Sequence, residues 1–202
     1  MRFPFFASFI VFCIWLGYEI HKHRNMEAKA SEDFWAKEAA ANNTRRKSLE
    51  NLDYIHIPFE ALPMDTLPEH PTVKDCQETL REISSEPVVN LTGITNTDLK
   101  LQYGAPNIEL LSQYDQRYTL LARTLQTWAE ALHKEGCPDD AVTVLEFAVK
   151  TRTDISASYK LLAKIYQQKG QPDKIRELIP VAESLNSPMK SHIVEFLKSL
   201  CQ

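Results

Sequence analysis

A sequence echo with a period of 34 residues constrains this chain more than any other feature. Over residues 122–188, a shift by one period brings side chains of the same chemical kind into register. The pairs are Leu125 with Tyr159, Trp128 with Leu162, Ala129 with Ala163, Leu132 with Tyr166, Gly136 with Gly170, Pro138 with Pro172, Leu145 with Ile179 and Ala148 with Ala182. A fixed period of this length predicts a helical repeat array, in which each unit buries its apolar face against the next.

Glycine and proline mark where the repeated helices end and begin. Gly136 and Gly170 each stand two positions before a proline, which is typical of one helix stopping and the next starting. Apolar spacing predicts helices over about 139–151, 155–169 and 173–185, and a last one within 190–202. Residues 108–135 predict one long helix or two with a break near Asp115, and Asp154 is a candidate N-cap.

The period and pattern resemble the tetratricopeptide repeat (TPR) family, whose unit is a helix–turn–helix with small residues where helices cross. Two repeats match, Ala122–Ile155 and Ser156–Met189, with Lys190–Gln202 as a capping helix. Departures include Leu125 at the usual first aromatic position and Ile175 where a small residue opens the second helix. The resemblance implies an all-α, TPR-like solenoid of about two repeats plus the cap, and a binding function.

In that family the first helix of each repeat lines a concave groove. The resemblance therefore implies these candidate binding residues: Arg123, Gln126, Glu130, Lys160, Lys164, Gln167 and Lys198. The asparagine that holds peptides in many such repeats is replaced by Thr127 and Leu161. The basic candidates favour a protein or peptide partner with an acidic segment, and a plainly solvated basic face is the alternative.

The N-terminal segment from Phe3 to Ile20 predicts a single transmembrane helix, with the membrane as a partner. Its first part, Phe3 to Tyr18, carries no charge, and Trp15 suits the interfacial aromatic belt. A cleaved signal peptide is the alternative, although no small-x-small cleavage site follows. Lys22 and Arg24 follow the run, and basic flanks are retained inside, so we expect the body to face the cytoplasm.

The middle of the chain predicts a helix followed by an irregular Pro-rich segment. Ser31 is a candidate N-cap for a helix reaching about Leu52. Three prolines at five-residue spacing exclude helix between residues 53 and 68. The apolar side chains there predict an extended strap docked on the globular part, with a free linker as the alternative. A further helix is predicted over 72–84.

The expected domain organisation has three parts. They are 1–30, an anchor with a basic flank; 31–106, a juxtamembrane helix, the strap and short helices; and 107–202, the TPR-like repeat domain. The net charge of the whole chain is −4, and no segment concentrates Lys and Arg enough for nucleic-acid binding.

Motifs for catalysis are missing from the sequence. There is no glycine loop for phosphate, no zinc-type histidine spacing and no Gly-x-Ser-x-Gly turn. The cysteines stand far apart, at Cys13, Cys76, Cys137 and Cys201. We therefore expect no enzyme, no cofactor and no metal. The expected function is a membrane-tethered protein-interaction adaptor or scaffold; a structural or assembly subunit of a larger membrane complex is the alternative.

Overall fold

The computed structural model describes residues 4–201, without the side chains of residues 4–7, 25, 26 and 28. The described part is helical, with α-helices α1 to α8, a short 3-10 segment η1 and a single antiparallel bridge between Tyr54 and Val89. The chain forms two compact units. The N-terminal unit comprises Met1–Lys47 and Asn96–Asn107, and the repeat unit comprises Ser48–Thr95 and Ile108–Gln202.

The first helix, α1 (Pro4–Asn42), is continuous through the position where a new helix was expected. The predicted helix start at Ser31 is therefore wrong. No proline lies between Pro4 and Pro58, so nothing in the chain forces a break at Ser31. The helix also ends earlier than Leu52, at Asn42.

The predicted transmembrane helix is also wrong. Within the described residues, no helix combines the length and the apolarity that crossing a membrane requires. The uncharged run covers residues 3–18, or 16 residues. Its first residue, Phe3, lies outside the described residues. At about 1.5 Å per residue the run would reach about 24 Å, less than the roughly 30 Å of a hydrocarbon core. The single-pass localisation is thereby corrected, and the cytoplasmic orientation deduced from the anchor loses its basis.

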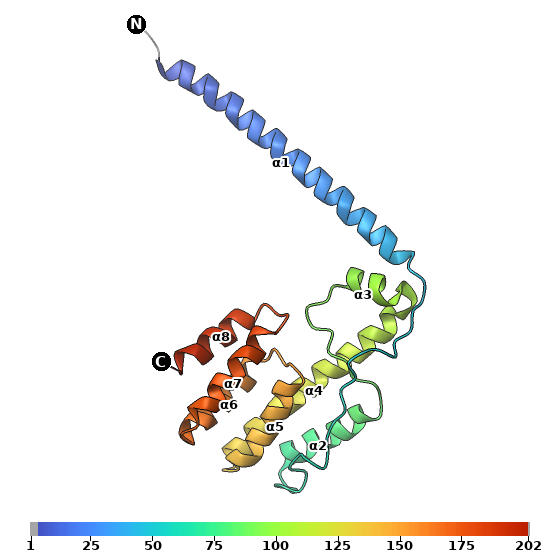
Figure 1. Cartoon of the computed structure of the whole chain (residues 1–202), viewed down its shortest axis with the longest axis vertical. Coiled ribbons are helices and arrows are strands. Elements are labelled where there is room, and N and C mark those ends of the chain that lie inside the picture. The colour runs from blue at the N-terminus through green and yellow to red at the C-terminus, as the bar shows by residue number, and fades with distance from the viewer. Residues whose placement is uncertain (1–3, 202) are drawn as a thin grey trace. The chain divides into compact units, whose positions relative to one another are not determined.

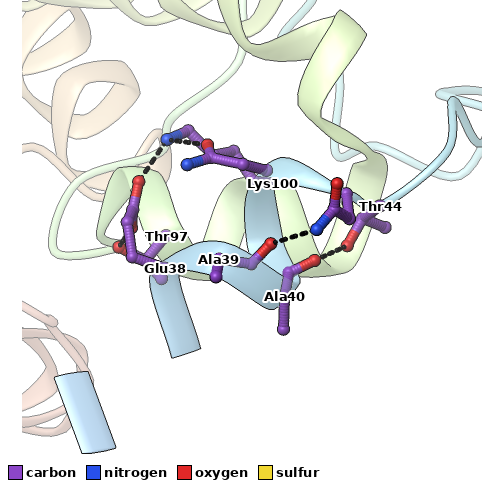
Figure 2. Close-up of polar contacts among 8 residues, drawn as sticks. Glu38, Ala39, Ala40, Thr44, Thr97 and Lys100 are labelled. Carbon is purple, nitrogen blue, oxygen red and sulfur yellow. Dashed lines mark hydrogen bonds and ion pairs between the residues drawn. The ribbon is translucent and has the colours of Figure 1, made fainter. Parts of the chain in front are cut away.

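Within the N-terminal unit, polar contacts around Glu38 join the end of α1 to α3 (Asn96–Tyr103), as Figure 2 shows. Glu38 accepts hydrogen bonds from Thr97 Oγ1 at 2.6 Å and from Lys100 Nζ at 2.5 Å. The same ammonium donates to Asn42 Oδ1 at 2.8 Å. The bonds from Lys100 and Thr97 lower the pKa of the Glu38 carboxyl, so this contact remains charged at neutral pH.

A second set of contacts fixes the chain that leaves α1. The Asn107 side chain, at the end of η1 (Ala105–Asn107), donates to Lys47 O at 2.8 Å and to Tyr103 O at 2.9 Å. Gly104 has a φ of +95°, and a Cβ there would lie 2.2 Å from Arg45 O. Only glycine fits this close approach of two backbones.

The repeat unit follows the predicted helix pattern closely. Its helices are α2 (Pro71–Ser84), α4 (Ile108–Lys134), α5 (Pro138–Lys150), α6 (Ser156–Gln168), α7 (Pro172–Glu183) and α8 (Lys190–Ser199). The stretch before Gly136 is one helix, with no break at Asp115. Helices α4 to α8 pack in chain order, α2 packs on α4, and α8 also contacts α6 (Figure 1).

In the core of the repeat unit, the small residues of the echo are buried, as predicted. Ala129, Ala148, Ala163 and Ala182 are all fully buried. The larger echo residues, such as Trp128, are buried with them, except Ile179, which is partly buried. Burying one large apolar side chain contributes about 1.5–3 kcal/mol, so the periodic positions account for much of the stability of this unit.

The Pro-rich strap is docked rather than free. Leu62 is buried, and Ile55, Ile57 and Phe59 are partly buried against the repeat core. The Ile55 N–H also donates to Val88 O at 2.9 Å. The docked strap predicted from the sequence is therefore confirmed, and the free linker is excluded.

Candidate functional site

The predicted groove residues lie on α4, α6 and α8, which occupy the first-helix positions of successive repeats. We call this surface the first-helix face. Ser158 Oγ donates to Gln126 Oε1 at 2.6 Å. One period later in the sequence, Lys160 Nζ lies 3.0 Å from His192 Nε2. The two contacts join positions one period apart, so α8 packs on α6 at the positions where α6 packs on α4.

The seven candidates differ in how available they are for a partner. Those with exposed side chains are Arg123, Glu130, Lys164, Gln167 and Lys198. Gln126 is only 8% exposed: its Nε2 donates to Glu130 Oε1 at 2.7 Å on the same helix, and its Oε1 accepts from Ser158 on α6, so this amide serves packing. Lys198 Nζ forms an ion pair with Glu183 Oε1 at 2.7 Å.

Lys160 is the one candidate of intermediate burial. It lies on α6, and its side chain reaches α8. Its Nζ lies 5.7 Å from the centroid of the Phe196 ring, within the range of a cation–π contact. Since its other neighbour is His192 Nε2, the lysine contributes to the joint between the two helices. Among the candidates, Arg123 and Lys164 remain as exposed cations without an ion pair within the described residues.

A second surface, which we call the turn edge, lies where the chain turns after α5 and after α7. A cavity of about 480 Å³ opens there. Lys150 and Ser184 both line it, and so do Arg152 and Asn186. The members of each pair are 34 positions apart, so the repeat itself brings two equivalent turns to one cavity. The strap, with Ile55, supplies another wall.

Two asparagine side chains tie the loop after Val89 to these turns. Asn90 Nδ2 donates to Thr151 O at 3.0 Å and to Arg152 O at 3.2 Å. Asn186 Nδ2 donates to Gly93 O at 2.9 Å. Gly93 has a φ of +79°, and a Cβ on it would lie 1.9 Å from Asn186 O. Glycine is thus required where the loop closes on the second turn.

Charges of both signs line the cavity. Within the described part of the chain, Lys150 and Arg152 take part in no ion pair. Asp154, predicted to cap α6, instead accepts a hydrogen bond from Ser187 Oγ at 2.7 Å. The N-cap of α6 is Ile155, which makes no side-chain capping bond. Asp53 is a second acid on the wall.

Buried tyrosines stand behind the turn edge. Tyr118 OH donates to Thr151 O at 3.2 Å, whereas the hydroxyl of Tyr159 is buried without a partner in the described structure. Burial, with the nearby charge of Asp154, raises the pKa of Tyr118 and raises that of Tyr159 to about 12. Both phenols therefore stay neutral at physiological pH, and Tyr118 holds the turn through the carbonyl of Thr151.

Sequence reasoning missed the turn edge entirely. The echo points to the helices, and the turn residues Lys150 and Arg152 do not resemble Ser184 and Asn186 in type. The one signal for it in the sequence is spacing, because the members of each pair are one period of 34 residues apart.

In comparisons with known proteins, no family model, no curated protein and no solved structure matches this chain.

Proposed function

We propose that the repeat unit is a protein-interaction adaptor that binds an acidic segment of a partner on the first-helix face. The proposal keeps the TPR-like character that the 34-residue echo implies. It leaves out the membrane tether, because no described helix is suited to cross a membrane.

The observation that carries the proposal is the alignment of α4, α6 and α8 by equivalent side-chain contacts. Helices held in this way present their outward side chains on one continuous surface. Arg123 and Lys164 are exposed there, and Glu130 is the acid among the candidates. An excess of basic groups attracts an acidic segment and raises its association rate.

Charge reversal on the first-helix face tests the proposal. The full chain and its Arg123→Glu/Lys164→Glu variant would be used to capture proteins from a lysate of the source cells. Both side chains are exposed, so the fold should tolerate the change. We expect the captured partner to be lost from the variant, as measured by quantitative mass spectrometry.

The matched control is Lys74→Glu/Arg81→Glu, which makes the same change of charge at exposed positions of α2. Circular dichroism would verify that both variants keep their helices. Equal recovery of partners by wild type and Arg123→Glu/Lys164→Glu would refute the proposal, and so would equal losses in both variants.

A fixed subunit of a larger protein assembly is the second candidate, and the surface of α1 favours it. A run of large apolar side chains on this helix is exposed: Phe9, Ile10, Val11, Phe12, Ile14, Trp15, Leu16, Tyr18 and Ile20. Contiguous exposed apolar surface marks an interaction site in soluble proteins. Under this proposal a permanent partner covers the run.

The mass of the isolated full chain, measured by light scattering, separates the two candidates. A fixed subunit should self-associate when alone, and Phe12→Ser/Trp15→Ser should make it monomeric. A monomeric wild type would contradict the fixed subunit and leave the adaptor standing.

A further inference from the structure

Three helix ends in the repeat unit share one hydrogen-bond pattern but not one residue type. In each, the N–H two positions after the C-cap residue donates to the carbonyl five positions earlier in the chain, which is the Schellman pattern. The bonds are Cys137 N to Leu132 O at 2.9 Å, Gln171 N to Tyr166 O at 2.9 Å, and Thr153 N to Ala148 O at 3.2 Å. The residue before each donor has positive φ: Gly136 at +80°, Gly170 at +66° and Arg152 at +60°.

Arg152 is the one residue of these three that is not glycine, so its positive φ needs a physical cause. A left-handed backbone suits glycine and strains any residue that carries a Cβ. Residues held in such conformations by their surroundings cluster at functional sites. Here the surroundings are specific, because Asn90 Nδ2 holds the carbonyls of Thr151 and Arg152, and Tyr118 OH holds that of Thr151.

The strained residue is also one that lines the cavity of the turn edge. Lys150, on the same turn, lines it as well, so one turn contributes two cations. The equivalent turn contributes neutral hydrogen-bonding groups from Ser184 and Asn186. The cavity is therefore asymmetric: the turn after α5 brings charged groups, Lys150 and Arg152 with Asp154, and the turn after α7 brings uncharged polar groups.

The two acids of the cavity form no ion pair with those cations within the described residues. Asp154 accepts a hydrogen bond from Ser187 Oγ at 2.7 Å, and Asp53 forms no ion pair within the described residues. Lys150 and Arg152 therefore have no carboxylate partner within the described residues, and together they can bind an anionic group from outside. An arginine beside a lysine suits a carboxylate, which accepts charge-assisted hydrogen bonds.

Apolar side chains complete the cavity. Ile55 comes from the strap, Phe147 from α5 and Leu185 from the turn after α7. The volume of about 480 Å³ falls in the range of roughly 300–1,000 Å³ typical of ligand pockets. A purely ionic ligand such as phosphate would leave this apolar wall unused, whereas a peptide can offer a carboxylate and an apolar side chain together.

We infer that the turn-edge cavity binds a short acidic segment of a protein, with a carboxylate on Lys150 and Arg152 and an apolar side chain against Phe147 and Leu185. The inference rests on the proposed adaptor function, and it adds a second recognition site away from the first-helix face. The left-handed conformation of Arg152 is the structural cost of having an arginine, and not a glycine, at this turn of the cavity.

The direct test is binding of a fluorescein-labelled peptide, acetyl-Gly-Glu-Phe-Glu-Gly-amide, to the full chain by fluorescence anisotropy. The matched peptide replaces both glutamates with glutamine, and a third replaces phenylalanine with glycine. We expect the acidic peptide to bind at least about tenfold more tightly than either. Equal binding of the acidic and glutamine peptides would overturn the inference. Displacement by inorganic phosphate, combined with equal binding of the glycine peptide, would show a simple anion site and overturn it too.

Variants of the turn locate the binding. Arg152→Gly should weaken binding of the acidic peptide by about tenfold while raising the thermal midpoint, because glycine relieves the strain. Lys150→Glu should weaken binding similarly, and Lys74→Glu on α2 should leave it unchanged. Wild-type affinity in Arg152→Gly would sink the inference.

The two proposals can fail separately. If Arg123→Glu/Lys164→Glu loses the cellular partner while both turn variants bind the acidic peptide like the wild type, the adaptor stands and the turn-edge site falls. If the turn variants lose the peptide while Arg123→Glu/Lys164→Glu retains every partner, the first-helix face falls.

Discussion

The first-helix face and the turn edge share the 34-residue period, but their polar side chains differ. On the face they contact one another across helices, and at the edge they line an open cavity. On the face, Ser158 satisfies Gln126 across two helices, and the equivalent contact recurs one period later. On the edge, Lys150 and Arg152 line a cavity without an ion pair in the described structure. Periodic packing therefore makes a regular core, and the loop and strap added to it turn one edge into an irregular pocket.

The largest effect expected from this comparison is at Gly93, where the loop meets the second turn. We predict that Gly93→Ala lowers the free energy of unfolding by about 2–4 kcal/mol, from backbone strain and from the clash of the new Cβ with Asn186. Chemical denaturation of the full chain measures it.

Gly136→Ala is the matched control, because Gly136 has nearly the same φ but nothing within 4 Å of a new Cβ. It should lose only about 1–2 kcal/mol. Equal losses at the two positions would mean that the loop is not closed on the turn.

Alkaline pH should produce the next largest effect. The pKa of Tyr159 is raised to about 12, so the folded state keeps its proton where the unfolded state, with a pKa near 10, releases it. The stabilisation is therefore full below pH 10 and falls by up to about 1.4 kcal/mol per pH unit between pH 10 and 12. Tyr118 adds to this slope in the same direction.

Urea denaturation at pH 9 and pH 11 measures the alkaline loss. In Tyr159→Phe the loss should be smaller, since this ring no longer titrates. An unchanged slope in Tyr159→Phe would contradict the assignment of the effect to the buried phenol.

The two equivalent contacts of the first-helix face should differ in strength. Ser158→Ala removes the donor to the buried Gln126 oxygen and should cost about 1–2 kcal/mol of stability. His192→Ala, at the exposed equivalent position, should change stability by less than about 0.5 kcal/mol. Denaturation midpoints of the two variants decide this, and a larger loss for His192→Ala would reverse the expected order.

The smallest expected effect is a gain at the turn edge. Arg152→Gly should raise the free energy of unfolding by about 1 kcal/mol, because the left-handed backbone no longer carries a Cβ. Arg152→Ala is the control, since it removes the guanidinium but keeps the strain. The same gain in Arg152→Ala would place the cause in the charge and not in the backbone.

Much of the repeat core followed from sequence because its signals are local. A small residue such as Ala129 or Ala163 predicts close packing at its own position, and Gly136 predicts a helix end at its own position. The structure buries both alanines and ends a helix before Gly136, as predicted. The docking of the strap was also predictable, since side chains such as Leu62 are too apolar for solvent.

The failures have physical reasons as well. The anchor was inferred from the composition of an apolar run, while spanning a membrane depends on a length that the described part of α1 does not supply. Gln126 was predicted to lie on a binding face. Its Oε1 accepts a hydrogen bond from Ser158, 32 residues away in sequence, so this oxygen is not available to a partner. The turn edge depends on Asn90 and Asn186, whose contacts join distant segments and leave no local pattern.

The contact between Asn186 and Gly93 spans 93 residues, against 32 for the contact between Gln126 and Ser158. Contacts that close long loops form late in folding, while short-range ones form early. During synthesis the helices can therefore stack one by one as they emerge, but the cavity stays open on one side until the turn after α7 has been made. A partner of the turn edge would bind only after residues 184–187 have been added to the growing chain.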